Sequence, residues 1–366
     1  MIAHRMKDID ASGIRKVFDL AAQMKNPVNL SIGQPDFDVP GPVREAAVAA
    51  INRGFNKYTP TQGTAELRDA VRLKLAQQGR TKHHENDDIV ITSGTTGGLF
   101  LAILALVNPG DEVLFADPYF VMYKHLVKLI GGVPVAIDTY PDFELSAARI
   151  EKHLTKKSKL LIINSPCNPT GNVITEKDLK EIAALANKRG LWVLSDEVYS
   201  SFCYDGPCWS IFPHVERGLL LDGFSKSHAM TGWRVGYAVG PPHVVQEMNK
   251  LQQYTFVCAP SMAQHAAVVA LGHDMKSALN AYRRKRDRLY QGLKDRFELK
   301  KPGGAFYAFP KAPGGNGAAF VEKAIAKQLL VIPGSVFSDK DTHFRISYAA
   351  SDETIDKGIE ILHSLA

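Results

Sequence analysis

Short apolar runs alternate with amphipathic helical patterns from about residue 65 to residue 280, and this alternation limits the possible folds more than any other feature of the sequence. The runs with the length and composition of buried strands are residues 89–92, 112–116, 133–137, 159–163, 191–195, 219–221 and 235–239. A helix is predicted over residues 176–189, with Thr175 as its N-cap. The alternation predicts a largely parallel sheet that is covered by helices on both faces. The short connection before the last strand allows that strand to run antiparallel.

The pattern changes near residue 280. Beyond it the sequence predicts a charged helix, a strand, a second helix and a second strand, at residues 281–297, 305–309, 318–328 and 343–347. Together these elements indicate a smaller α+β domain. Residues 1–40 combine a helical stretch with an extended Gly/Pro segment around Gly33. We therefore expect an N-terminal segment (1–40) that packs with the small domain, a large three-layer α/β domain (41–279) and a small C-terminal domain (280–366).

The composition is that of a globular protein: 45% of the 366 residues are hydrophobic and 22% are charged. The net charge is +6, and the densest basic run, residues 283–288, is expected to form the solvated face of a helix rather than a nucleic-acid-binding arm. Residues 1–13 lack the apolar core of a signal peptide, and no apolar stretch is long enough to span a bilayer. The four cysteines have neither metal-site spacing nor the pattern of a disulfide framework. We expect a cytoplasmic protein without a metal site and with no nucleic-acid or membrane partner.

Turn-forming and reactive residues follow the predicted strands. They occupy residues 93–98, 117–120, 164–171, 196–199 and 224–226. In open α/β sheets ligands bind outside the carboxyl ends of the strands, so these segments are expected to meet at one edge. The turn at 93–98 precedes an apolar helix, whose first N–H groups and dipole suit a phosphate, although such a turn can also serve only as a cap. It lacks the lysine and the terminal Ser/Thr of a P-loop, which argues against a nucleotide.

The segment from Leu221 to Arg234 is the strongest indication of chemistry. Lys226 directly follows Ser225 and lies eight residues before Arg234, just after a short apolar strand. A lysine can form an imine with an aldehyde, while a hydroxyl and a guanidinium can hold a phosphate, and pyridoxal phosphate has both groups. Burial and the positive charge of Arg234 would lower the pKa of Lys226, which must be partly neutral to attack an aldehyde. A single Ser-Lys pair would ordinarily lie on the surface, so the argument depends on the combination.

Three further side chains fit the same interpretation. Asp196 ends an apolar strand, where an unpaired carboxylate is costly, and a protonated pyridine nitrogen would be a suitable partner. A helix N-cap or a structural ion pair would explain this residue as well. Tyr199 lies one helical turn further on and could point its hydroxyl into the same pocket. Phe120 follows a Pro turn, where its ring could stack on a cofactor or simply join the core.

The sequence resembles the class I/II aminotransferases, the aspartate-aminotransferase-like enzymes of fold type I that use pyridoxal phosphate. The resemblance extends from about Ile32 to Ser351 and rests on motifs that occur in this order: SIGQPDF, YTPTQGTAELRDAV, DPYF, NSPCNPTG, SDEVY, GFSKSHAMTGWRVGY, GGAFY and FRISYA. It implies an enzyme of amino acid metabolism or biosynthesis that moves an amino group from an L-amino acid to a 2-oxo acid. On resemblance alone, the aspartate or aromatic type is favoured.

Carried over by position, the motifs imply roles around the cofactor ring. Lys226 corresponds to the lysine that binds the cofactor covalently and acts as the base of the 1,3-proton shift. Asp196 corresponds to the partner of the pyridine nitrogen. Tyr199 and Asn168 correspond to the hydrogen-bond partners of the ring hydroxyl. Phe120 takes the stacking position that the family often fills with Trp or Tyr.

Other positions match residues that hold the cofactor phosphate. The resemblance assigns the phosphate to the backbone of Thr95 and Thr96, together with Ser225 and Arg234. Tyr58 corresponds to a tyrosine that reaches the phosphate in the neighbouring subunit. This match implies a homodimer in which the two subunits share their sites.

The substrate is assigned to three positions. Arg345 resembles the arginine that forms a bidentate pair with the substrate α-carboxylate, a geometry that lysine could not reproduce. Asn168 matches a residue that contacts the same carboxylate. Gly33 lies where the N-terminal segment of the family closes over the substrate.

The sequence departs from the family pattern at three places. Gly223 stands where some relatives have a phosphate-binding serine, so one phosphate ligand would be missing. Cys167 replaces a larger polar residue, which would allow thiol sensitivity, although an inert small residue explains it as well. After Thr96 the helix begins Gly-Gly-Leu-Phe, without the cation that a distal substrate carboxylate would need, and this puts aspartate specificity in doubt.

Two other functions remain open at this point. A β-eliminating C–S lyase or a cyclising synthase would use the same cofactor and the same motifs, because side chains at the pocket mouth decide the outcome. The second alternative is a non-catalytic regulator that keeps the fold. Such regulators generally add a DNA-binding domain, for which no room is expected before Gly33.

Overall fold

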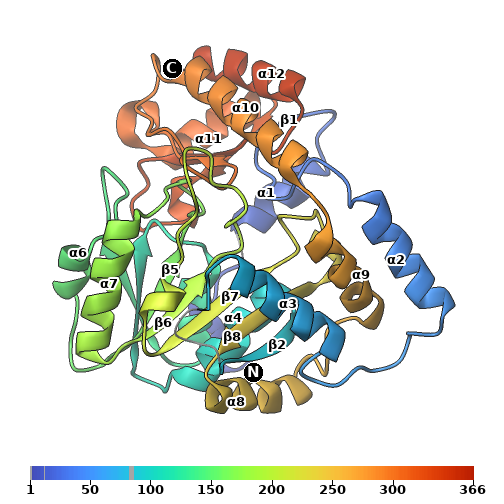
Figure 1. Ribbon diagram of the computed structural model, residues 1–366. Coiled ribbons are helices and arrows are strands. Elements are labelled where there is room, and N and C mark those ends of the chain that lie inside the picture. Colours follow the sequence, from blue (N-terminus) through green and yellow to red (C-terminus); the bar gives the residue numbers. More distant parts are fainter. Residues whose placement is uncertain (1, 12, 82–85) are drawn as a thin grey trace.

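The computed structural model describes every residue except 1, 12 and 82–85, and its largest element is a seven-stranded sheet (Figure 1). Across the sheet the strands follow the order β2 (Asp88–Ser93), β8 (Val235–Gly240), β7 (Gly218–Gly223), β6 (Trp192–Asp196), β5 (Ser158–Asn164), β3 (Glu112–Asp117) and β4 (Val133–Asp138). β8 is antiparallel to both of its neighbours, and the other adjacent pairs are parallel. Every strand predicted in this region is present, and the last one is the antiparallel strand.

Helices cover both faces of this sheet because its strands alternate apolar side chains between the two faces. In β5, Leu160 and Ile162 pack into the core on one face, whereas Leu161 and Ile163 pack into the core on the other. The helices of the first layer are α4 (Gly94–Leu106), α5 (Met122–Leu129) and α8 (Pro242–Gln253), and those of the second are α2 (Gly41–Asn52), α3 (Ala65–Gln77), α6 (Ala147–Glu151), α7 (Glu176–Arg189) and α9 (Ser261–Gly272). The predicted three-layer α/β arrangement is confirmed.

Helix α7 has the bounds that the sequence predicts. The side chain of Thr175 accepts a hydrogen bond from the backbone N–H of Asp178 at 3.1 Å, which satisfies a donor of the first turn. Leu179 and Ile182 lie on the buried face of the helix. Local capping and apolar spacing therefore agree with the tertiary packing here.

The C-terminal region forms a smaller α+β unit above the sheet in the view of Figure 1. Its antiparallel sheet has the order β11 (Ile332–Pro333), β12 (Phe344–Ser347) and β9 (Tyr307–Ala308). Helices α10 (Lys276–Leu293), α11 (Gly317–Ala326) and α12 (Asp352–His363) pack around it, with α10 and α12 side by side. The smaller α+β part is confirmed, but α12 was not predicted.

All four predicted elements of this region differ from the structure in their bounds, and the helix expected at 318–328 and the strand expected at 343–347 do so by one or two residues at an end. The other two differences have a local cause. The helix expected at 281–297 spans Lys276–Leu293, because the carboxylate of Asp274 accepts a hydrogen bond from the N–H of Lys276 at 2.9 Å and so supports an earlier start. The strand expected at 305–309 is reduced to Tyr307–Ala308. Ala305 has a φ of 54°, which no extended strand allows.

The N-terminal residues pair with the C-terminal region. Helix α1 (Gly13–Ala21) is followed by β1 (Val28–Asn29), which lies parallel to β10 (Leu329–Leu330). Leu30 comes next and is buried in the same core as Leu329. Further along, the carboxylate of Asp36 accepts a hydrogen bond from the Tyr282 hydroxyl of α10 at 2.6 Å. The chain between these anchors carries Gly33 past the sheet edge.

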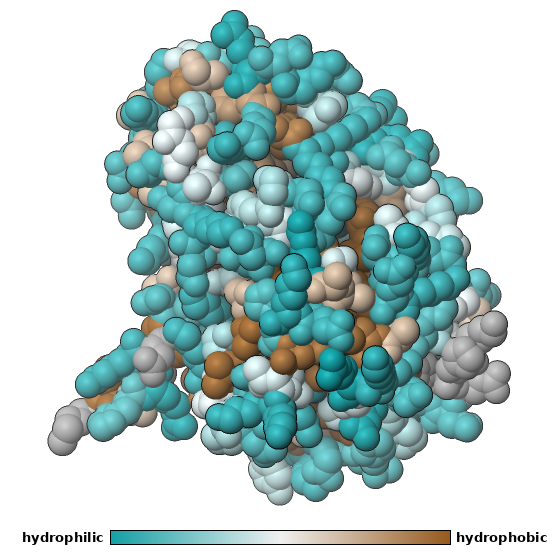
Figure 2. All heavy atoms as spheres, turned by 90° about the vertical axis from the view of Figure 1, so that its left-hand side faces the viewer, coloured by the Kyte–Doolittle hydropathy of each residue, from teal (hydrophilic) through white to brown (hydrophobic). Residues whose placement is uncertain are grey.

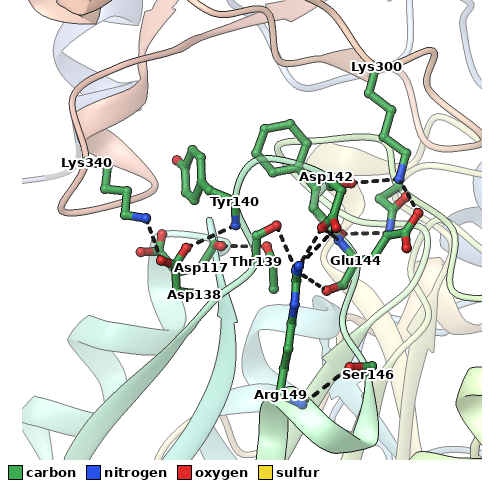
Figure 3. Close-up of polar contacts among 12 residues, drawn as sticks. Asp117, Asp138, Thr139, Tyr140, Asp142, Glu144, Ser146, Arg149, Lys300 and Lys340 are labelled. Atoms are coloured by element: carbon green, nitrogen blue, oxygen red, sulfur yellow. Dashed lines mark hydrogen bonds and ion pairs between the residues drawn. The ribbon is translucent and has the colours of Figure 1, made fainter.

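Two lysines tie the C-terminal region to loops of the large sheet (Figure 3). Lys340 Nζ lies 2.7 Å from Asp138 Oδ2 at the end of β4. Lys300 Nζ donates to the carbonyl oxygen of Asp142 at 2.7 Å and to Glu144 Oε1 at 3.1 Å. Arg149 donates to both oxygens of the Asp142 carboxylate, from Nη1 to Oδ1 at 2.8 Å and from Nη2 to Oδ2 at 2.9 Å. These contacts fix the two parts of the molecule against each other beside the sheet edge.

The surface is mostly polar on the face that Figure 2 presents, with hydrophobic residues in smaller areas between hydrophilic ones. None of the helices in the described part of the chain is long and apolar enough to cross a membrane. Within the same residues, no group of His, Cys, Asp and Glu side chains is arranged to hold a metal ion.

Candidate active site

A cavity of about 250 Å³ opens at the carboxyl ends of β5, β6 and β7, beside the first turn of α4. Every predicted site residue except Tyr58 lines it: Gly33, Thr95, Thr96, Phe120, Asn168, Asp196, Tyr199, Ser225, Lys226, Arg234 and Arg345. The segments that follow the strands therefore meet at one edge, as the strand order predicts. Ile14 and Tyr307 also line the cavity, and sequence reasoning did not single them out.

Lys226 is partly buried at the floor of the cavity. Its Nζ donates a hydrogen bond to the carbonyl oxygen of Gly33 at 2.6 Å. Burial and the positive charges of Arg345 and Arg234 lower the pKa of Lys226 to about 8. The lowered pKa expected from burial and Arg234 is present, but Arg345 makes the larger electrostatic contribution.

Asp196 is 5% exposed at the end of β6. Its Oδ2 accepts a hydrogen bond from the Tyr123 hydroxyl at 2.6 Å, and its Oδ1 accepts a longer one from the Val198 N–H at 3.4 Å. Burial raises the pKa of the Asp196 carboxyl to about 6, although both hydrogen bonds act in the opposite direction. Sequence reasoning missed Tyr123, whose position one helical turn after Phe120 was the available signal.

Two tyrosine hydroxyls meet at one wall of the cavity. The hydroxyls of Tyr199 and Tyr307 lie 2.9 Å apart, and the two rings pack edge to face. A Cβ on Gly33 would lie 2.6 Å from the Tyr307 hydroxyl, so only glycine lets the N-terminal segment approach this closely. Tyr307 belongs to the GGAFY motif, but nothing local in the sequence indicated its contact with Tyr199.

Arg345 is 1% exposed and is fixed from several sides. Its Nη1 donates to Asn168 Oδ1 and its Nη2 donates to the Ser31 carbonyl oxygen, each at 2.9 Å. The guanidinium carbon lies 4.5 Å from the ring centroid of Tyr307 and 4.7 Å from that of Phe337. Nε is buried without a hydrogen-bond partner among the described residues. Nη1 and Nη2 each use one of their two N–H groups in the bonds above, so the guanidinium keeps donors for a ligand.

The first turn of α4 and the Arg234 side chain form the opposite end of the cavity. Helix α4 begins at Gly94, so the N–H groups of Thr95 and Thr96 belong to its first turn and have no intrahelical acceptor. Ser225 and Arg234 line the cavity with them. Arg234 is held in place by a hydrogen bond from Nη1 to the Thr231 carbonyl oxygen at 2.9 Å. This end combines a helix N-terminus, a hydroxyl and a guanidinium, which suits an anion.

Gly223 has a packing reason for lacking a side chain. A Cβ at this position would lie 2.9 Å from Thr95 Oγ1 and 3.0 Å from the Cα of Gly236. A serine would therefore force the strand ends of β7 and β8 apart. Thr95 presents its own hydroxyl next to Gly223.

Two residues named from the sequence stand apart from the cavity wall. Tyr58 is 84% exposed, so the described chain alone does not bring it to the site. Cys167 is partly buried and does not line the main cavity. Burial raises the pKa of the Cys167 thiol, which keeps it protonated and favours the inert alternative.

The donor set of the cavity fits pyridoxal phosphate. Thr95 Oγ1 and Arg345 Nε are buried without hydrogen-bond partners in the described residues, and Asp196 has no ion-pair partner there. A pyridinium nitrogen would complete the contacts of Asp196, and a phosphate would suit the end formed by α4 and Arg234. Lys226, with its lowered pKa, would meet an aldehyde in partly neutral form.

Comparisons with known proteins agree with this chemistry. The family model for aminotransferase class I and II matches residues 25–362. The probable aspartate aminotransferase of Methanocaldococcus jannaschii is 37% identical, with 100% of each chain covered. Aromatic-amino-acid aminotransferase 2 of Thermococcus litoralis is also 37% identical, over 98% of this chain and 96% of its own length. The solved structure of aspartate aminotransferase from Thermus thermophilus with maleate superposes with a TM-score of 0.94 at 32% identity and covers both chains completely.

Proposed function

The chain belongs to the class I and II aminotransferases, and from this premise we propose that it works with pyridoxal 5′-phosphate bound in the cavity described above. It has the fold type I architecture of its relatives and is an aminotransferase. When bound, pyridoxal phosphate supplies an aldehyde that links to amines and a protonated ring that accepts electrons. The protein supplies binding, orientation and proton transfer.

One observation carries the proposal. Three side chains line a single cavity: a lysine with a lowered pKa, a buried carboxylate that has no ion-pair partner among the described residues, and a buried arginine with spare donors. These are Lys226, Asp196 and Arg345. If each of these residues had only a structural role, there would be no reason for all three to line the same cavity.

We assign proton movement to Lys226. With a pKa of about 8, its amine can take a proton from the α-carbon of the substrate and return it to the product side. The positive charges of Arg345 and Arg234 lower the pKa of this amine and so make it release the proton more readily. The Gly33 carbonyl oxygen orients the amine at the cavity floor.

Arg345 and Asn168 are proposed to bind the substrate carboxylate. The Asn168 amide oxygen fixes Nη1 of Arg345, and Nη1 and Nη2 each keep a second N–H for an acceptor. A planar guanidinium pairs with a carboxylate through two parallel hydrogen bonds. Gly33 permits the N-terminal segment to close this side of the cavity.

The remaining lining residues are proposed to hold the cofactor. Asp196 would pair with the ring nitrogen, Tyr199 and Asn168 would donate to the ring hydroxyl, and Phe120 would stack on the ring. The N–H groups of Thr95 and Thr96, the Ser225 hydroxyl and the Arg234 guanidinium would hold the phosphate.

We further propose that the enzyme is a cytoplasmic homodimer of amino acid metabolism or biosynthesis. Tyr58 is highly exposed and would reach the phosphate in the neighbouring subunit, which supports the dimer. The division into residues 1–40, 41–279 and 280–366 is also a proposal. The separate cores of the large sheet and of the C-terminal region support it.

Aspartate or an aromatic amino acid is the proposed donor, because relatives of both types are similar over the whole chain. Within the described residues, the cations that line the cavity are Lys226, Arg234 and Arg345, and each already has a proposed role. A distal carboxylate would therefore need a cation from outside this lining. The aromatic donors need none.

The half-reaction of the purified protein tests the proposal. The protein is loaded with pyridoxal phosphate, and aspartate, glutamate, tyrosine or phenylalanine is added singly while the visible spectrum is recorded. An aminotransferase loses the visible band of the lysine-bound cofactor and regains it on addition of a 2-oxo acid. Release of ammonia and pyruvate from a cysteine derivative, without any 2-oxo acid, would instead identify an eliminating lyase.

A further inference from the structure

A buried ion cluster lies directly behind the cavity, on the face of the sheet that α3 covers. Arg80, which follows α3, places its guanidinium between two carboxylates. Its Nη1 lies 3.1 Å from Asp222 Oδ2, and its Nη2 contacts Glu197 Oε2. All three residues are at most 7% exposed. The two acids belong to adjacent parallel strands, because Glu197 follows β6 and Asp222 lies in β7.

Each acid is close in sequence to a residue that is proposed to carry the chemistry. Glu197 directly follows Asp196, whose own carboxylate points to the opposite face of the sheet. Asp222 precedes Lys226 by four residues. Its Oδ1 accepts a hydrogen bond from the N–H of Gly223 at 2.7 Å, at the start of the turn that leads to Lys226. Arg80 therefore joins the two strand ends that present Asp196 and Lys226.

Hydroxyl groups satisfy the remaining oxygens of the cluster. Glu197 Oε1 accepts hydrogen bonds from Ser195 at 2.7 Å and Ser210 at 2.5 Å. Asp222 Oδ2 also accepts a longer one from Ser200 at 3.3 Å. Other titratable groups of the described chain near the cluster are Tyr237 and Cys208, and Lys74 and His228 line the same small cavity as Arg80 and Asp222. The carboxylate oxygens are therefore held by Arg80, hydroxyls and the Gly223 N–H, which leaves little freedom to the strand ends.

Such a cluster is a poor way to gain stability alone. Removing three charges from water costs nearly as much as their attraction returns, and apolar side chains of similar volume often stabilise a protein as well or better. A planar guanidinium does fix the direction and spacing of two carboxylates. Glu197 and Asp222 also act on Asp196, because burial and their negative charges raise its pKa. Arg80 lies against both acids and so offsets part of their charge.

We propose that Arg80 is a positioning residue for the transamination reaction, which sets the placement of Asp196 relative to Lys226 through Glu197 and Asp222. Arg80 does not line the cavity and touches neither reacting group. Its effect is mechanical, because a movement of either strand end changes the distance between the ring-nitrogen partner and the lysine. The inference rests on the proposed use of pyridoxal phosphate.

The test compares Arg80→Met with Arg286→Met. Arg286 is a matched control, because it is 1% exposed, pairs with Asp205 at 2.6 Å and lies in α10 away from the cavity. Both variants lose a buried guanidinium: Arg80→Met leaves the buried Glu197 and Asp222 unpaired, and Arg286→Met leaves the exposed Asp205 unpaired. The readouts are the melting temperature of the cofactor-free protein, the visible circular dichroism of bound pyridoxal phosphate, and kcat and KM for the best donor.

We expect both variants to melt at lower temperature than the wild type. Only Arg80→Met should lose visible circular dichroism intensity, and its kcat should fall by about tenfold or more with KM nearly unchanged, since small displacements of reacting groups are costly. Arg286→Met should keep the wild-type dichroism and kcat. A kcat and dichroism of Arg80→Met equal to the wild type would overturn the proposal. The same losses in Arg286→Met would overturn it as well.

Arg80→Lys keeps the test decisive if Arg80→Met does not fold. Lysine retains the charge but has one nitrogen, so it cannot hold two carboxylates in a fixed plane. The proposal expects a folded enzyme with reduced kcat and reduced visible dichroism. Wild-type values in Arg80→Lys would show that charge alone suffices and would refute positioning. A wild-type protein whose visible band ignores every amino acid would refute the proposed function instead.

Discussion

At the residue scale, burial acts in opposite directions on the two ionisable groups at the centre of the cavity. It lowers the pKa of Lys226 to about 8 and raises that of Asp196 to about 6. Both pKa values are thereby moved closer to neutral pH, where a lysine can both accept and release a proton. The Tyr123 hydroxyl restrains the shift of Asp196 and helps it to stay ionised.

Cofactor uptake should therefore depend on pH. Only the neutral amine of Lys226 attacks an aldehyde, so the rate at which the cofactor-free protein takes up pyridoxal phosphate should rise as the pH passes about 8 and then level off. Stopped-flow absorbance of the forming visible band measures this rate. An ordinary lysine titrates at about pH 10.4, and a midpoint of the rate profile at that pH would contradict the lowered pKa of Lys226.

Removal of the Tyr123 hydroxyl should impair turnover more than binding. In Tyr123→Phe, Asp196 loses a hydrogen bond of 2.6 Å that lowers its pKa, so the carboxyl should hold its proton to higher pH. A hydrogen bond to a charged group contributes about 1.5–3 kcal/mol, which corresponds to a fall in kcat of roughly 10-fold or more. KM for the amino acid should change little, because Tyr123 does not line the cavity.

The pH profile of kcat is the deciding measurement for this variant, since its acid limb should move to higher pH. Tyr119→Phe is the matched control, because Tyr119 is a neighbouring buried ring that packs on Phe115 and is not bonded to Asp196. An unchanged profile in Tyr123→Phe would show that Asp196 does not depend on this hydroxyl.

The site residues that directly follow strands could be predicted from the sequence, because the carboxyl ends of the strands meet at one edge of an α/β sheet, where ligands bind. Lys226, Asp196 and Phe120 were found in this way. Tyr123, Tyr307 and Arg80 were not, and of these only Tyr307 lies in a motif that the sequence analysis named. Their roles depend on contacts across the fold, such as the bond from Tyr123 to Asp196, and single-sequence reasoning has no access to the partner.

At the scale of elements, agreement between sequence and structure follows the strength of local signals. Helix α7 has a capping residue, a regular apolar face and a glycine after its end, and its bounds were predicted correctly. Helix α12 has Ser351 as N-cap and acidic residues in its first turn, so the signals were present but overlooked. The predicted length of strand β9 was too great, because apolar composition does not reveal the positive φ of Ala305.

The N-cap of α7 should contribute measurably to stability. In Thr175→Ala the N–H of Asp178 loses its acceptor, and the free energy of unfolding should fall by about 1 kcal/mol. Thr175→Ser retains the hydroxyl and should remain close to the wild type. Urea denaturation of the three proteins provides the comparison. Equal stability of the alanine and wild-type proteins would mean that water replaces the cap without loss.

At the scale of the whole molecule, the cavity lies where three parts of the chain meet. The N-terminal segment brings Gly33, the large sheet brings Lys226, and the C-terminal region brings Arg345. The ion pairs of Lys300 and Lys340 hold the last two parts together (Figure 3). Tyr58 is exposed, and its proposed contribution is to the site of a second subunit.

The proposed dimer predicts that Tyr58 acts on the cofactor of its neighbour. Tyr58→Phe should weaken pyridoxal phosphate binding by roughly 10-fold, because a hydrogen bond to a charged phosphate is lost. Tyr254→Phe is the control, since Tyr254 is equally exposed at 85% and has no assigned contact. Sedimentation of the wild type should give two chains per particle. A monomer that binds the cofactor with full affinity would rule out shared sites.

Lys226 is the residue proposed to hold pyridoxal phosphate in this cavity. Borohydride reduction of the loaded protein fixes the cofactor to the amine that carries it, and peptide mass spectrometry then locates it. The phosphopyridoxyl group should lie on the peptide that contains Lys226, and Lys226→Ala should incorporate none. Modification of another lysine in the wild type, with Lys226 left free, would rule out this role of Lys226.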